Sequence, residues 1–227
     1  GVARNIAVLL GRAGAPCRFI SVVGDDSAGR ELIAELDAAG LLDTPRYRQA
    51  KRAAEDAFTA APLRQPVFAG QAYPEEPSLL AAYLDGILAL APAGSGETTP
   101  PWAVIAPHID PEAGKTAYAA AYAPLRGLAP NRVVILGVGH QLLTGLYCLT
   151  DKTFATPLGP VPSDATAVAR LRQAGGAIVD PAALPHRAEH SVEFQTVFLC
   201  HVLDRAPFAV TPVLCGSPLG VLPAYSR

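Results

Sequence analysis

Two runs of apolar residues, each ending in a histidine, dominate the middle of the chain. They cover Ala103–His108 and Val133–His140, and a segment of helical length separates them. Continuous valine, isoleucine and leucine are typical of parallel strands buried on both faces, and the crossover between such strands places their carboxyl ends at one edge of the sheet. The pattern therefore predicts a βαβ unit that brings His108 and His140 to one crevice, where ligand sites form in open α/β sheets.

Apolar spacing predicts further elements on both sides of this unit. Near the N-terminus we expect a helix over 2–13, a strand over 18–23 and a helix over 27–39, with Ser27 as its cap and Gly40 as its stop. The other predicted elements are a helix over 79–90, a helix over 165–174 capped by Asp164, a helix that begins near Ser191 and a strand over 210–214.

Composition divides the chain into parts. Residues 45–62 are rich in Arg, Lys, Ala and Gln and are bounded by prolines, which predicts a connecting helix or linker. Residues 91–101 have the Gly, Ser and Pro content of a surface loop. We therefore expect a fragment over 1–44, a linker over 45–62 and a domain over 63–227.

Bulk composition excludes several classes of function. The 227 residues are 50% hydrophobic and 17% charged with a net charge of −2, so most of the chain is expected to be globular. The absence of a basic run argues against nucleic-acid binding, and no apolar stretch is long enough to span a membrane. We expect a cytoplasmic protein whose partners are small molecules or proteins. Because the chain contains no methionine, we interpret it as an internal fragment.

The N-terminal part resembles the start of a pfkB or ribokinase-type carbohydrate kinase. The resemblance lies in Gly1–Asn5 and Val23–Gly29. It implies an αβα fragment in which Asn5 contacts a sugar substrate and Asp25 or Asp26 lies near the lid. The family's later catalytic and ATP-binding motifs have no counterpart downstream, which argues against kinase activity. The alternative is an ordinary strand-to-helix turn with a cap and an exposed Asn5.

Six motifs over residues 63–217 are similar, in the same order, to the Memo family of the AmmeMemoRadiSam system protein B type. They are Arg64–Pro74, Val104–Asp110, Val134–His140, Phe154–Asp164, Glu189–Gln195 and Thr211–Gly216. The resemblance implies an α/β fold with a mostly parallel sheet flanked by helices, related to class III extradiol dioxygenases. In such a fold, strand-end histidines bind non-haem iron or copper, and His108 and His140 match those positions. Family members continue further, into a region with the third ligand, so we expect the domain to be C-terminally incomplete and inactive.

The residues themselves support a metal site at these two histidines. Imidazole suits iron, copper and zinc, and second-sphere carboxylates orient metal-bound histidines, a role that Asp110 can fill for His108. The alternative is that each histidine is an ordinary core residue with its hydrogen bonds satisfied. A lone Cys215 at a strand end is expected to be a buried apolar residue.

A third group of chemical side chains lies at His186–Glu193. If helical throughout, His186 and His190 would share a face as in zinc-protease helices, but Pro185 favours a later helix start. We therefore interpret Glu189 and His190 as a general acid or base at a helix N-terminus. A capping cluster, with Ser191 as N-cap and Glu193 in the first turn, is the alternative.

These observations leave three hypotheses for function. The first is a metal-dependent oxidoreductase of extradiol-dioxygenase type that carries iron or copper. The second is a non-catalytic scaffold whose crevice binds a phosphorylated or acidic peptide or a partner protein. The third is a sugar kinase fragment. Fold resemblance alone does not choose among them.

Overall fold

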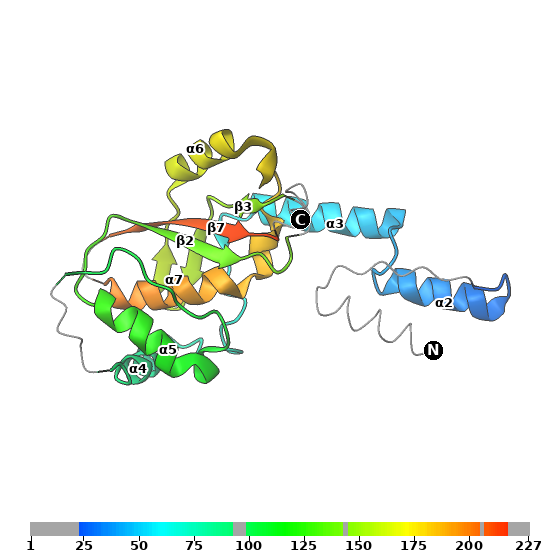
Figure 1. The fold of residues 1–227 in the computed structure, drawn as a ribbon. Helices are drawn as coiled ribbons and strands as arrows, with labels where there is room; N and C mark the ends of the chain where they lie inside the picture. The colour runs from blue at the N-terminus through cyan, green and yellow to red at the C-terminus, as the bar shows by residue number, and fades with distance from the viewer. Residues whose placement is uncertain (1–22, 93–98, 143–144, 205–206, 218–227) are drawn as a thin grey trace, which may run out of the picture. The chain divides into compact units, whose positions relative to one another are not determined.

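The structure is a computed structural model that describes residues 23–92, 99–142, 145–204 and 207–217. The chain divides into two compact units over 1–60 and 61–227, and each is described by itself (Figure 1). The predicted helix over 2–13, nearly all of the predicted strand over 18–23, and Asn5 lie outside the described residues.

Two helices make up the described part of the first unit. They are α2 (Ser27–Ala38) and α3 (Pro45–Ala60), so the predicted helix after the turn is confirmed, and the segment predicted as a connecting helix or linker contains a helix. The cap of α2 is Asp26, whose carboxylate accepts a hydrogen bond from the Gly29 backbone nitrogen at 2.8 Å. The prediction of Ser27 as cap is wrong by one residue, because Asp and Ser are equally good caps.

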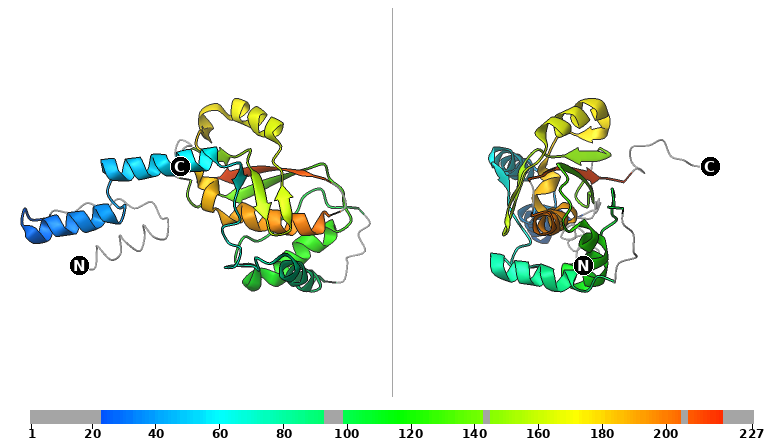
Figure 2. Two further views of the ribbon diagram at one scale, coloured as in Figure 1. Left: turned by 180° about the vertical axis from the view of Figure 1, so that it is seen from behind. Right: turned by 90° about the vertical axis from the view of Figure 1, so that its left-hand side faces the viewer.

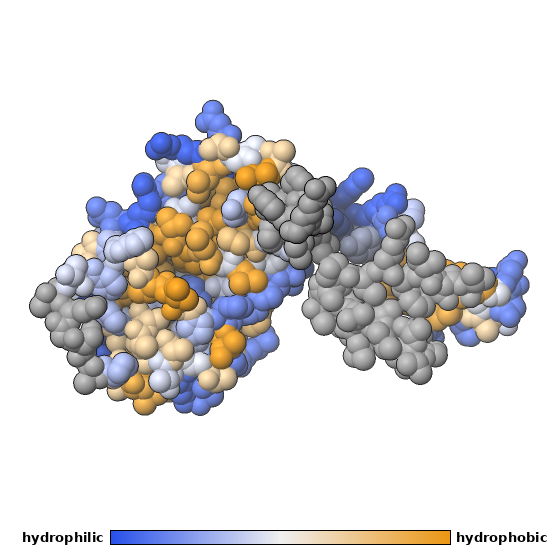
Figure 3. Space-filling view, viewed as in Figure 1, coloured by the Kyte–Doolittle hydropathy of each residue, from blue (hydrophilic) through white to orange (hydrophobic). Residues whose placement is uncertain are grey.

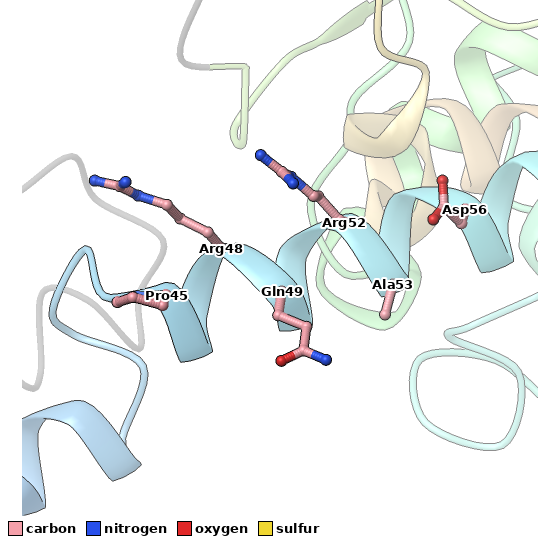
Figure 4. Close-up of a pocket in the computed structure, with 6 residues that line it drawn as sticks. All are labelled: Pro45, Arg48, Gln49, Arg52, Ala53 and Asp56. Atoms are coloured by element: carbon pink, nitrogen blue, oxygen red, sulfur yellow. The ribbon is translucent and has the colours of Figure 1, made fainter.

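An open hollow of about 410 Å³ lies along α3. Figure 4 shows Arg48 and Arg52 extending from one side of the helix and Gln49 from the other. The Arg48 guanidinium donates two hydrogen bonds to the Asp43 carboxylate, at 2.8 and 2.9 Å, and these bonds lower the pKa of Asp43. Both partners are exposed, so the pair contributes little to stability.

The second unit is an α/β fold on two small sheets (Figure 1). Its strands are β1 (Leu63–Arg64), β2 (Arg132–Val138), β3 (Tyr147–Leu149), β4 (Thr153–Thr156), β5 (Gly159–Val161), β6 (Val179–Asp180) and β7 (Ala209–Cys215). The sheet orders are β1-β4-β5 and β2-β7-β3-β6. In the first, β1 and β4 are parallel and β5 is antiparallel to β4. In the second, β2 and β7 are parallel, β3 is antiparallel to β7, and β6 is parallel to β3.

The α/β class is confirmed, but the sheets are mixed where the sequence predicts a mostly parallel one. The connection from β2 to β3 explains the difference in the larger sheet. It is too short to hold a crossover helix, and parallel strands need a connection of roughly a dozen residues or more. The chain therefore turns back after β2, and β3 runs antiparallel to both β2 and β7.

Helices cover both faces of the larger sheet. Those of the second unit are α4 (Pro77–Leu88), α5 (Pro111–Tyr122), α6 (Ala165–Gly175) and α7 (His190–Val202), with short 3-10 turns over Ala123–Leu125, Gly176–Ile178 and Leu184–Ala188. Figures 1 and 2 show α7 against one face with α5 and α4 beyond it, and α6 against the other. The predicted helices at 79–90 and 165–174 are confirmed, and Asp164 caps α6. None of the described helices is long and apolar enough to cross a membrane.

The centre of the core is α7, in which ten of thirteen residues are buried. Its Phe198 stacks on two rings of α5: the centroid of Tyr118 lies 4.5 Å away and that of Tyr122 lies 4.8 Å away. Leu80 and Leu84 of α4 are fully buried in the same cluster. A helix packed on most sides cannot shift without disturbing its neighbours, so α7 holds its own side chains in fixed positions.

The predicted strand over 103–108 is wrong: these residues, all of them described, form no strand. The intervening segment is helical as predicted, because α5 occupies it. Two features account for the missing strand. Pro107 has no backbone N–H to donate to a ladder, and Ile105 is 99% exposed, so the apolar run is not buried between layers.

The predicted strand that leads to His140 is confirmed as β2, but it is not buried on both faces. β2 lies at the edge of its sheet among the described strands. Ile135 is buried, whereas Val134 is 58% and Leu136 is 71% exposed. Figure 3 shows hydrophobic surface gathered on the face of the second unit turned to the viewer. The neighbouring β7 is the strand that matches the doubly buried pattern, since Val210 through Leu214 are all buried.

Candidate metal centre

Three histidines from separate segments converge in the second unit. His108 lies in the irregular segment before α5, His140 follows β2, and His190 is the first residue of α7. Their ring centroids are 5.3 Å apart for 108 and 140, 5.7 Å for 108 and 190, and 4.7 Å for 140 and 190. One donor nitrogen from each lies within 4.8 Å of the others, so the three form a candidate metal-binding group.

A glycine lets α7 approach the end of β2 closely. A Cβ built on Gly137 would lie 2.7 Å from both the Ser191 hydroxyl and a Val192 methyl group. The same close approach allows the Ser191 hydroxyl to donate a hydrogen bond to the Val138 carbonyl at 2.9 Å. Any side chain at 137 would push the helix N-terminus, and with it His190, away from His140.

Glu189 joins the helix start to His140. It is the N-cap of α7 and is 2% exposed. Its carboxylate accepts hydrogen bonds from the backbone nitrogens of Ser191, at 2.9 Å, and His140, at 3.1 Å. Nδ1 of His140 lies 3.0 Å from its Oε1. The prediction of Ser191 as cap is therefore wrong, because the Glu189 carboxylate occupies that role and the serine hydroxyl bonds to β2 instead.

The charge state of Glu189 fixes the role of His140. Burial alone raises the pKa of this carboxyl, but the hydrogen bonds from Ser191 and His140 outweigh it and hold the pKa below its usual value. An ionised carboxylate can only accept, so Nδ1 of His140 carries the proton. In the neutral ring this tautomer leaves Nε2 as the nitrogen that can bind a metal.

The surroundings of His190 favour its neutral form. Burial lowers the pKa of His190, and the nearby His140 and His108 lower it further, against the opposing attraction of Glu189. A metal binds the unprotonated nitrogen of a neutral imidazole. The environment of the cluster therefore favours the protonation state that metal binding needs.

Comparison of the sequence with known proteins identifies a family for the part of the chain that holds the three histidines. The family model for Memo-like proteins matches residues 64–218, more than half of the chain. The chain belongs to the Memo-like family. The MEMO1 family protein of Aquifex aeolicus is 27% identical over 175 residues, which is 77% of this chain and 46% of the relative. That of Thermus thermophilus is 31% identical over 171 residues, which is 74% of this chain and 51% of the relative.

This Memo-like chain spans about half the length of the curated relatives it matches. The match to the MEMO1 family protein of Methanocaldococcus jannaschii, 31% identical over 162 residues, covers 56% of that relative. Residues 1–58 are similar to a different family, the pfkB family carbohydrate kinases. That match includes α2 and most of α3. The predicted resemblances are thus both confirmed, over separate parts of the chain.

Other predicted site residues of the Memo-like domain lie outside the histidine group. Asp110 is exposed and caps α5, where its carboxylate accepts from the Glu112 backbone nitrogen at 2.8 Å. His186 is buried in the 3-10 turn before α7, with Nε2 3.1 Å from the Cys148 carbonyl. The turn ends at Ala188 and α7 begins two residues later, so the two histidines do not share one continuous helix as a zinc helix requires.

Asp25 and Cys215, the remaining residues considered from the sequence, also lie outside the histidine group. Asp25, in the first unit, is exposed and accepts a hydrogen bond from the Arg30 guanidinium at 2.9 Å. Cys215 ends β7 as predicted, and its carbonyl accepts from the Gly139 backbone nitrogen at 2.9 Å. Burial raises the pKa of the Cys215 thiol. Its sulfur is not among the donor atoms of the histidine group.

A buried ion pair lies beside the turn that leads into α7, and the sequence predicted no role for its arginine. Arg64 is fully buried and pairs with Glu193 of α7. It also donates to the backbone carbonyls of His186, at 3.0 Å, and Glu189, at 2.9 Å. Arg64 therefore fixes the turn that leads into α7. Its signal in the sequence was indirect: Glu193 stands within an apolar helix, and a buried carboxylate needs a partner.

Two further residues were missed because their partners are backbone atoms. Gln195 of α7 donates to the Pro107 carbonyl at 3.1 Å. Tyr118 of α5 donates to the Ile109 carbonyl at 2.9 Å. These carbonyls flank His108 on both sides. A polar residue in an otherwise buried helix is again the available signal for Gln195, whereas nothing in the sequence distinguishes Tyr118 from an ordinary core aromatic.

Proposed function

We propose that the Memo-like domain binds a non-haem transition metal, iron or copper, through the imidazoles of His108, His140 and His190. The observation that carries the proposal is the convergence of three donor nitrogens, all within 4.8 Å of one another. Metal–nitrogen distances of about 2.0–2.1 Å place the ligands of one ion roughly 3 to 3.5 Å apart. The group is therefore within a small side-chain rotation of the spacing that an ion requires.

The donor set suits the proposed metals. Imidazole binds iron, copper and zinc, and three protein ligands leave open positions for a small molecule. When bound, iron or copper at such a site supplies Lewis acidity and one-electron chemistry. The side chains of His140 and His190 are 41% and 30% exposed, so a small molecule can reach the group from solvent.

The protein residues divide into ligands and a supporting carboxylate. Glu189 is buried and bonded to His140, which suits a residue that orients a ligand better than one that exchanges protons with a substrate. His190 has two possible roles: third ligand, or general base beside a metal held by the other two histidines. Its position within the donor group favours the ligand role.

Binding of Co²⁺, Cu²⁺ and, without oxygen, Fe²⁺ tests the proposal. Titration calorimetry is expected to give one site per chain, lost in His108→Ala, His140→Ala and His190→Ala. His201→Ala is the matched control, because His201 lies outside the group and bonds to Asp85. Retention of one tight site in all three alanine variants would overturn the proposal. Retention in His190→Ala alone would reassign that residue from ligand to base.

The reaction class is a separate part of the proposal. Relationship to extradiol dioxygenases predicts oxygen consumption by the iron-loaded chain with a catechol, measured with an oxygen electrode. Dependence of that uptake on His140 would support an oxidoreductase. A chain that binds iron stoichiometrically and consumes no oxygen with catechols would limit the proposed function to metal binding.

A further inference from the structure

Each of the three histidines is connected to α7. His190 is part of the helix, and His140 is bonded to the helix cap, Glu189. His108 lies in a segment without a strand, so no ladder of backbone hydrogen bonds fixes its position. Something else has to hold it, because a loop ligand without support does not keep a fixed distance to its partners.

The support comes from side chains that donate hydrogen bonds to backbone carbonyls on either side of His108. On one side, the Gln195 amide donates to the Pro107 carbonyl at 3.1 Å. On the other, the Tyr118 hydroxyl donates to the Ile109 carbonyl at 2.9 Å. Each bond replaces one that a neighbouring strand would otherwise have provided. The two together fix the peptide group that precedes His108 and the one that follows Ile109.

Gln195 and Tyr118 are themselves fixed by contacts in the core. The Gln195 amide nitrogen also donates to the Ser191 carbonyl at 3.1 Å, and its oxygen accepts from the Tyr122 hydroxyl. The rings of Tyr118 and Tyr122 stack on Phe198 and are buried. Neither side chain can therefore swing away without breaking other contacts.

We infer that Gln195 and Tyr118 are positioning residues that set the place of His108 relative to the other two imidazoles. The inference rests on the proposed metal-binding function for its purpose, but its geometric content stands without a metal. Because Gln195 also belongs to α7, contacts of this helix or its cap help to fix the distances between all three imidazoles. The helix thus acts as the common frame of the site, although only one ligand belongs to it.

The test uses Tyr118→Phe and Gln195→Glu. The first removes one hydroxyl and keeps the stacked ring. The second keeps the size of the side chain and an acceptor for the Tyr122 hydroxyl, but removes the donor to the Pro107 carbonyl. Tyr83→Phe is the matched control, because it removes a tyrosine hydroxyl whose partner is Glu112 on the surface.

The first measurement needs no metal. NMR spectra of the protein with isotope-labelled histidine rings are expected to show a shifted and broadened His108 signal in Tyr118→Phe and Gln195→Glu. Variants that each replace one histidine assign the signals. The His201 signal should stay unchanged, and Tyr83→Phe should match the original protein throughout. An unaltered His108 signal in Tyr118→Phe overturns the inference, even if Gln195→Glu does not fold.

The second measurement adds Co²⁺ alone. If the proposed function holds, Tyr118→Phe is expected to bind Co²⁺ roughly 10- to 100-fold more weakly, as for other residues that support a ligand, with an altered visible spectrum. Equal affinity and an identical spectrum would overturn the positioning role. Failure of the original protein to bind Co²⁺ would instead count against the metal site, and the NMR result would still decide the geometric inference.

Discussion

The carboxylate of Glu189 lies 3.0 Å from Nδ1 of His140 and at the same time caps the helix that begins with the next histidine. One side chain thereby fixes the tautomer of one imidazole and the backbone position of another. Changes at this residue should consequently affect the two histidines together.

Glu189→Gln is predicted to weaken Co²⁺ binding about 10- to 100-fold. The amide keeps an oxygen that can accept the cap hydrogen bond. Its NH₂ group, however, faces another donor, either the backbone nitrogen of His140 or the Nδ1–H of the His140 ring. The negative charge that favours a proton on Nδ1 is also lost. Calorimetry measures the affinity. Glu112→Gln, an exposed glutamate on α5, is the control, and equal affinities for both variants would contradict the proposed role.

Removal of Arg64 should destabilise the second unit strongly. Arg64→Met leaves Glu193 as an uncompensated charge in the interior, which costs about 3–5 kcal/mol of unfolding free energy. Urea unfolding followed by circular dichroism measures this loss. The double variant with Glu193→Gln should recover part of it, because it removes the buried charge and the amide oxygen still accepts from one of the backbone nitrogens of Val67 and Phe68. A single variant as stable as the original protein would show that the pair is energetically neutral.

His186 should make stability depend on pH in an acidic window. Burial is the main cause that lowers its pKa to about 4, whereas an unfolded histidine has a pKa of about 6.5. Between these values the unfolded chain holds more protons, so stability is fully present above pH 6.5 and falls as the pH drops towards 4. The expected loss is about 3 kcal/mol.

Unfolding free energies at several pH values check this prediction. His186→Gln removes the titrating group and keeps a possible donor to the Cys148 carbonyl. Its stability should change less than that of the original protein over the same interval. Parallel curves for the two proteins would assign the pH dependence to other groups.

The same substitution on two neighbouring strands should destabilise the protein to very different extents. Leu214 of β7 is fully buried, whereas Leu136 of β2 is 71% exposed. Leu214→Ala is expected to cost about 2–5 kcal/mol through lost burial and a cavity, and Leu136→Ala about 0.5 kcal/mol or less. Thermal and urea unfolding measure both. A large cost at Leu136 would mean that the exposed face of β2 is covered in solution.

The sequence predicted the meeting of two histidines partly for the wrong reason. The rule that parallel strands end at one edge brought His108 and His140 together, and their rings do lie 5.3 Å apart. Only the second histidine follows a strand. The first is positioned by side chains from α5 and α7, and hydrogen bonds to backbone carbonyls leave no spacing pattern in a sequence.

Helices were predicted better than the details of their ends. α4 and α6 follow from apolar spacing and from Pro77 or Asp164 at the helix start, and the start of α7 follows from Pro185 a few residues before it. The cap residue is harder to predict, because consecutive polar residues compete for it. Asp26 precedes Ser27, and Glu189 lies two residues before Ser191. The partner of each carboxylate in the fold decides the outcome, and that partner is not local.

Buried charge was the feature most hidden from sequence. Arg64 stands between Leu63 and Gln65, and an arginine is normally exposed whatever its neighbours in the sequence are. Its burial becomes understandable only with Glu193, more than a hundred residues later, and with the carbonyls of the turn before α7. Patterns of neighbouring residues carry no information about such distant pairs.

The ten buried residues of α7 have one more consequence, for the metal-free protein. In small zinc domains the ion replaces a core, and chelators unfold them. Here the frame that carries the ligands belongs to the hydrophobic interior and exists before any ion arrives. Stripping the protein with a chelator should therefore empty the site and lower the melting temperature only by the binding free energy that is lost, while the chain stays folded.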